Sequence, residues 1–208
     1  MDRRTHAAAL AALTIALVGG CAEQQEPKAA PASPSASPSP TASPVTPGPP
    51  WHDEVAAAPA GVTVGRKGTA CPLPVTFSVP KGWKVEAVTA DATVGKATML
   101  CEIDARPAGG LGFLRVWRVN GVAGGGQEHL EHFVDAYSPK ATGVEYRRLR
   151  AGTVDAVEAS YTQDGDLDRA VALSSLYGPV VLSLDAPDPQ ELLPAYQLVK
   201  HSAKINRD

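Results

Sequence analysis

Alternation of apolar and polar residues predicts a series of β-strands from residue 75 onward. The clearest run, Val75-Thr76-Phe77-Ser78-Val79, stops at the turn sequence Pro80-Lys81-Gly82. Asp164-Gly165-Asp166 has the composition of a tight turn between two later strands. Strand-like patterns cover residues 83–85, 99–105, 111–119, 144–149, 154–161, 170–177 and 180–184.

Two segments have helical spacing instead. Residues 127–137 follow a flexible glycine connection and place four apolar side chains on one face: Leu130, Phe133, Val134 and Tyr137. A second helix begins near Asp188, which can cap it, and Pro189 fits its first position. Pro194 should bend its early turns. Its expected buried stripe is formed by Leu192, Ala195, Tyr196 and Val199.

Two helices among six or seven mostly sequential strands predict an α+β fold. We expect one antiparallel sheet, or a pair of sheets, flanked by the two helices. Residues 59–208 have the length of a single domain with one core. All of these patterns therefore belong to one globular α+β domain.

The N-terminus has a different pattern, in which a basic head with Arg3 and Arg4 precedes an apolar run over residues 7–18. Val18-Gly19-Gly20-Cys21 then resembles the lipobox of bacterial lipoprotein precursors, although Val18 replaces the usual Leu. The run is shorter than the roughly 20 residues of a spanning helix. We therefore predict a signal peptide over residues 1–20, lipidation of Cys21 with diacylglycerol and palmitate, and anchoring at the extracytoplasmic face of the cell membrane. The alternatives are an ordinary secretory signal with a coincidental cysteine, or an uncleaved membrane segment.

Residues 21–58 are rich in Pro, Ser and Ala. Such a segment lacks the large apolar side chains that offset the entropy of ordering, and its prolines favour extended polyproline II geometry. We expect a disordered linker that holds the domain up to roughly 70 to 90 Å from the bilayer. It is an inert spacer or a glycosylated one.

The domain retains two cysteines, Cys71 and Cys101. Export places them in an oxidising compartment, so we expect a disulfide bond between them. Closing a loop of this length would stabilise the fold by about 3 to 4 kcal/mol. Two buried free thiols are the alternative.

Charge and motifs narrow the function. The net charge of −3 argues against nucleic acid as a partner, and Arg147, Arg148 and Arg150 look like a solvated strand edge. Asp164, Asp166 and Asp168 begin like a calcium loop, but the glycine and the glutamate that such a loop needs are missing, which favours a hairpin turn.

Catalytic signatures are equally sparse. The sequence has no nucleophile elbow and no recognisable acid/base pair, so we expect neither an enzyme nor a cofactor, and a cell-wall hydrolase is the least favoured class. His129 and His132 stand three apart on the first helix, but neither zinc-protease order is present. A solvated helix face is the preferred interpretation, and a metal site is the alternative.

Finally, the order of the patterns resembles a known family. Phe77-x-Val79-Pro80-x-Gly82-Trp83, an inserted helix, the strand over residues 180–184 and a closing helix with Tyr196 and Ser202 are similar to actinobacterial lipoproteins of the LpqN type. Those proteins have the α/β/α sandwich fold of the photosystem extrinsic protein PsbP. The resemblance implies a docking role and no enzymatic activity.

We therefore expect a membrane-anchored extracytoplasmic lipoprotein whose domain binds a protein, such as an envelope protein partner, or another cell-envelope component. The alternative is a receptor lipoprotein that binds a small ligand, or a metal through His129 and His132.

Overall fold

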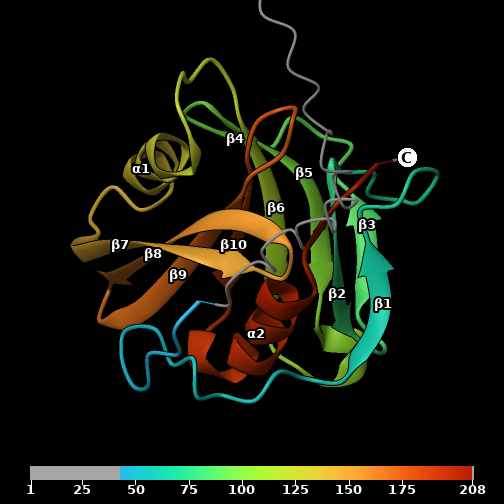
Figure 1. Cartoon of the computed structure of the whole chain (residues 1–208), viewed down its shortest axis with the longest axis horizontal. Helices are drawn as coiled ribbons and strands as arrows, with labels where there is room; N and C mark the ends of the chain where they lie inside the picture. Colours follow the sequence, from blue (N-terminus) through green and yellow to red (C-terminus); the bar gives the residue numbers. More distant parts are fainter. Residues whose placement is uncertain (1–42, 208) are drawn as a thin grey trace, which may run out of the picture. The chain divides into compact units, whose positions relative to one another are not determined.

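An antiparallel sheet of eight strands forms the centre of the computed structural model, which describes residues 43–207 (Figure 1). The strand order is β3-β5-β6-β10-β9-β8-β7, with the short β4 paired to β5. The strands are β3 (Lys84–Ala87), β4 (Thr93–Val94), β5 (Ala97–Asp104), β6 (Phe113–Val119), β7 (Thr142–Ala151), β8 (Val154–Gln163), β9 (Asp166–Leu173) and β10 (Val180–Asp185).

A second, three-stranded sheet contains strands from both ends of the described chain. Its order is β1-β2-β11, again antiparallel, with β1 (Ala60–Val64), β2 (Val75–Pro80) and β11 (Lys204–Ile205). In β2 the alternating pattern has the expected consequence, because Val75, Phe77 and Val79 are buried and the residues between them are half-buried.

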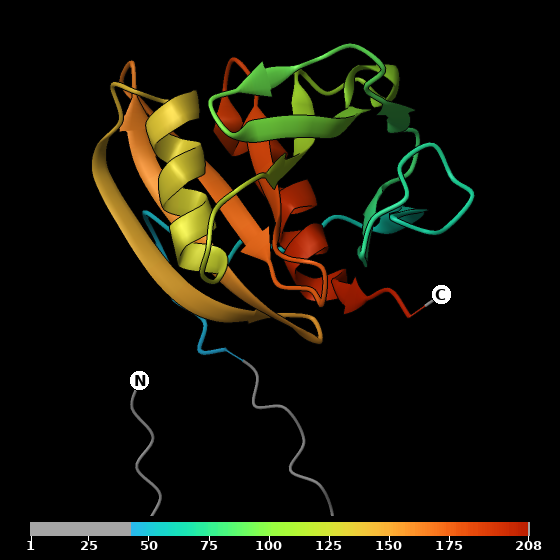
Figure 2. The ribbon, with the colours of Figure 1, turned by 90° about the horizontal axis from the view of Figure 1, so that it is seen from above.

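The two α-helices of the described residues cover opposite faces of the large sheet (Figure 2). Helix α1 (Gly126–Tyr137) packs Leu130, Phe133 and Val134 against Trp117 and its neighbours on one face. Helix α2 (Leu193–Ser202) shares the other core with β2, and a 3-10 turn, η2 (Pro189–Leu192), precedes it. Another 3-10 turn, η1 (Arg106–Ala108), lies between β5 and β6. The predicted α+β class with antiparallel sheets and two helices is confirmed.

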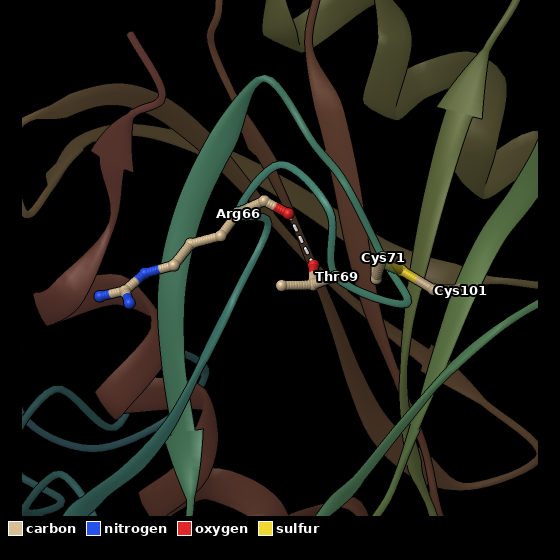
Figure 3. Close-up of a disulfide and its surroundings, with 4 residues drawn as sticks. All are labelled: Arg66, Thr69, Cys71 and Cys101. Carbon is tan, nitrogen blue, oxygen red and sulfur yellow. Dashed lines mark hydrogen bonds between the residues drawn. A yellow bond between two sulfur atoms is a disulfide. The ribbon is translucent and has the colours of Figure 1, made fainter. Parts of the chain in front are cut away.

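The Cys71–Cys101 disulfide joins the β1–β2 loop to strand β5 (Figure 3). Both cysteines are buried, and the loop also has a local hydrogen bond of 2.6 Å from Thr69 Oγ1 to the carbonyl oxygen of Arg66. The bridge closes a loop of 30 residues and links the small sheet to the large one, which corresponds to about 3 to 4 kcal/mol in the chain-entropy model.

Three features differ from the expectations. Strand β9 ends at Leu173 instead of continuing to residue 177, because a turn closed by the Gly178 N–H and the Ser175 carbonyl oxygen follows it. Helix α2 starts only at Leu193, since Pro194 lacks an N–H and is accommodated in the first turn, after a 3-10 turn capped by Asp188. The short strands β1, β4 and β11 had no sequence prediction.

The predicted linker also needs a correction at its C-terminal end. Residues 43–58 lie against the large sheet and α2, with Trp51 only 8 % exposed. The reason is a set of polar contacts with residues far along the chain, which composition does not reveal. The predicted signal peptide, Cys21 and linker residues 21–42 lie outside the described residues.

Candidate functional site

A buried cluster of charged side chains fastens the segment 43–58 to the domain. Arg147 on β7 makes a bidentate ion pair with Asp53, with N–O distances of 2.6 and 2.7 Å. Its guanidinium also lies 4.4 Å from the centre of the Trp51 ring, a cation–π contact. One arginine thus contacts both an apolar and an acidic side chain of the segment.

Two further members of the cluster lie deeper. Glu158 on β8 is fully buried and accepts hydrogen bonds from Arg147 Nη2 at 2.6 Å and Lys200 Nζ at 3.2 Å. Lys200 on α2 also donates to Asp53 at 3.0 Å. Burial alone would raise the pKa of Asp53, but hydrogen bonds from Arg147, the Thr46 N–H and Lys200 hold it well below its ordinary value.

Backbone carbonyl groups of the same segment are also bound. Arg169 Nε donates to the carbonyl oxygen of Pro50 at 2.8 Å, and Gln197 Nε2 donates to that of His52 at 2.9 Å. Both donors are fully buried. Arg169 and Gln197 therefore hold the backbone of the segment in place, while the charged cluster holds its side chains, and we assign both sets of contacts a positioning role.

A hollow of about 680 Å³ lies between this segment, β7 and α2. Its lining includes Trp51, Leu149, Arg150, Lys200 and His201. The cations Arg147 and Lys200 in its wall are already paired with Asp53 and Glu158. If the protein were instead a receptor for a small ligand, this hollow is where the ligand would bind.

The most exposed large apolar side chains of the described domain are adjacent in the β9–β10 turn. Leu176 is 88 % exposed and Tyr177 86 %. The turn is held by hydrogen bonds around Ser175, whose hydroxyl donates to the Gly178 carbonyl at 2.6 Å and accepts from the Tyr177 N–H at 3.1 Å. Gly178 adopts a φ of 94°, which favours glycine. The turn thus presents two apolar side chains to the solvent on a fixed backbone.

Two hollows flank this turn. One, of about 290 Å³, has Tyr177 beside Lys67 and Arg118. The other, of about 600 Å³, has Leu176 and Tyr177 beside Arg150 and Arg207. Asp155 is the one acidic side chain in either lining. We call Leu176, Tyr177 and these basic residues, Lys67, Arg118, Arg150 and Arg207, the turn surface.

The predicted solvated helix face holds for only one histidine of the pair, because His129 packs inside the domain. His129 is buried and its Nδ1 lies 2.8 Å from the Gly125 carbonyl oxygen at the start of α1, whereas His132 is exposed. No group of three or more His, Cys, Asp or Glu within residues 43–207 is arranged to hold a metal ion. His129 instead contacts the backbone at the N-terminus of α1.

Comparison with known families adds the membrane context. A family model described as an uncharacterised lipoprotein matches residues 41–203. The chain belongs to this lipoprotein family. Family membership supports anchoring of the lipoprotein to a membrane by a lipid, and the matched region includes the segment 43–58. No curated protein and no solved structure matches the chain. Of the helices in the described part of the lipoprotein, none is long and apolar enough to span a membrane.

Sequence reasoning found the disulfide pair but missed both structural features of the site. Leu176 and Tyr177 were included in a strand, because they continue an apolar pattern. The Ser-Ser before them and the Gly-Pro after them are typical turn residues, and they could have indicated a turn from the sequence. Arg147 was expected at a solvated edge, and the structure places it in the charged cluster instead.

Proposed function

We propose that this lipoprotein is acylated at Cys21, lies on the extracytoplasmic face of the membrane and binds a component of the cell envelope at the turn surface. Membership of a lipoprotein family supports the anchor. The lipobox resemblance supports Cys21 as the acylated residue and export as the route.

The observation that carries the binding role is the adjacent exposure of Leu176 and Tyr177. Single exposed apolar residues are common on protein surfaces and need no explanation. Two adjacent ones, at the tip of a hydrogen-bonded turn and between two hollows, are typical of an interaction site. Tyrosine in particular combines a large apolar ring with a polar end, which suits a contact that is partly wet.

The role we propose is binding without catalysis. The turn surface is open to solvent, whereas catalytic sites gain much of their effect by excluding water from the reacting groups. The resemblance to LpqN-type lipoproteins with the PsbP-like fold agrees with a docking role. Helices on both faces of an antiparallel sheet are also the layers of that sandwich.

A photoreactive amino acid in place of Tyr177, in the full chain expressed in cells, tests the binding role. We expect discrete crosslinked adducts, because the partner covers this position. The matched control is the same amino acid in place of Leu111, which is also apolar and exposed but lies before β6, at the other end of the large sheet.

Charge reversal gives the second arm of this experiment. Arg118→Glu should weaken the Tyr177 adducts without altering the fold, because Arg118 is exposed beside the turn. Equal adducts from positions 177 and 111, or none from either, would contradict the proposal.

A further inference from the structure

We infer that the component bound by the turn surface is the anionic lipid surface of the membrane that carries the acyl anchor. This inference rests on the proposed function, and it names the partner. It follows from the charge of the turn surface, from its position in the sheet and from the point at which the anchored chain reaches the domain.

The charge of the turn surface is opposite to that of the whole chain. The chain has a net charge of −3, yet the two hollows beside the turn contain four basic residues and one acidic residue. Asp155 is itself paired with Arg150. A surface of positive charge with Leu and Tyr at its tip matches an anionic headgroup layer, where basic residues are attracted and aromatic residues favour the interface.

At the opposite end of the large sheet, the β8–β9 turn has the opposite charge. Consecutive antiparallel strands put the β7–β8 and β9–β10 turns at one end of the sheet and the β8–β9 turn at the other. That other turn carries Asp164, Asp166 and Asp168. The basic turn surface and the acidic β8–β9 turn therefore lie at opposite ends of these strands, which favours an orientation with the turn surface toward an anionic surface.

The anchored chain enters at the basic, apolar end. Ser43, the first described residue, accepts a hydrogen bond through Oγ from the Arg150 N–H, next to the β7–β8 turn. Arg150 in turn lines the same hollow as Leu176 and Tyr177. The described chain thus begins on the same side of the domain as the turn surface.

The length of chain between Cys21 and Ser43 allows the contact. Twenty-one residues, the length of 22–42, would reach about 65 Å in polyproline II geometry and would span about 25 Å on average as a random coil. The tether therefore holds the domain close enough for the turn to meet the bilayer repeatedly. Each basic residue near an anionic surface then raises the ratio of membrane-bound to unbound domain by about fivefold.

An environment-sensitive fluorophore in the mature, acylated protein tests this inference. Leu176→Cys is labelled, and the protein is reconstituted into vesicles of phosphatidylcholine with or without phosphatidylglycerol. We expect the emission at position 176 to shift to shorter wavelength with phosphatidylglycerol, and to be quenched by spin-labelled lipids. The matched control, Leu111→Cys, should remain in water in both vesicles, because it lies at the opposite end of the sheet.

Charge reversal and the crosslinking result separate the outcomes. Lys67→Glu and Arg207→Glu should each weaken the phosphatidylglycerol effect by about fivefold or more. A label at 176 that stays in water in both vesicles overturns the inference. If Tyr177 nevertheless crosslinks to a protein in cells, the proposed binding role stands with a protein partner. If it crosslinks to nothing, the proposed function fails as well.

Discussion

Individual charged residues decide where the globular domain begins. Asp53 and Glu158 each contact both Arg147 and Lys200, so every charge in this set has an opposite charge beside it. Removing one member of a buried pair is costly because it leaves the other charge unpaired in a poorly solvated place. The cluster is therefore sensitive to single substitutions, even though such a set of charges adds little net stability.

Asp53→Asn should destabilise the domain by about 3 kcal/mol at pH 7, because Arg147 and Lys200 lose their shared carboxylate. The pKa of Asp53 is lowered in the folded state, so its contribution is present above the ordinary Asp pKa of about 3.9 and is lost as the pH falls. The gap between wild type and variant should thus narrow below about pH 4, and thermal melts across this range measure it.

The control for this experiment is Asp155→Asn. Asp155 also pairs with an arginine, but its side chain is 80 % exposed, so the change should stay within about 1 kcal/mol. A gap for Asp53→Asn that is constant between pH 7 and pH 3 would contradict the assigned pairing.

The sequence could not reveal these contacts at the residue scale. Asp53 lies 94 positions from Arg147 and 147 positions from Lys200, and its neighbours along the chain resemble a linker. In contrast, Cys71 and Cys101 were predictable as a pair, because export limits the chemistry of two cysteines in one domain. Local composition thus fails where the stabilising partners are distant in sequence.

At the scale of elements, the β8–β9 hairpin collects acidic side chains on one short turn. Asp164 and Gly165 both adopt positive φ, at 52° and 100°, as a two-residue hairpin turn requires. Further along β9, burial and the neighbouring Asp166 raise the pKa of Asp168 to about 6. The folded hairpin therefore binds a proton more tightly than the unfolded chain does.

Asp168→Asn should stabilise the domain at pH 7 by about 1 kcal/mol, after allowance for solvent screening of this half-buried side chain. Because the folded pKa is raised, wild type loses stability as the pH rises from about 4 to 6, whereas the variant does not. Urea denaturation at pH 4 and pH 7 should show the gain only at the higher pH. Asp164→Asn, at the exposed tip, should change stability by less than about 0.5 kcal/mol.

Periodicity predicted most elements, since the sheet buries alternate residues of β2 and α1 buries one helical face. It failed at element ends. β9 was extended through Leu176 and Tyr177 because an exposed apolar residue looks the same in sequence as one that fills a core. The short strands β4 and β11, of two residues each, are too brief for any period to appear.

On the scale of the whole molecule, the described chain begins at the same end of the large sheet as the turn surface, opposite the acidic β8–β9 turn. The segment 43–58 is part of the folded domain, because the charged cluster and Gln197 bind it to β7 and α2. Packing of this segment also places Ser43, the first described residue, beside Arg150 at the end of β7.

The proposed membrane anchor and the proposed lipid contact of the turn surface both depend on acylation of Cys21. The most direct measurement therefore compares wild type with Cys21→Ser in cells grown with radiolabelled palmitate. We predict that wild type incorporates the label and sediments with membranes, because two acyl chains anchor a protein stably. The variant should carry no label and leave the membrane fraction. Wild type without label, or a variant that sediments with membranes as wild type does, would contradict the account.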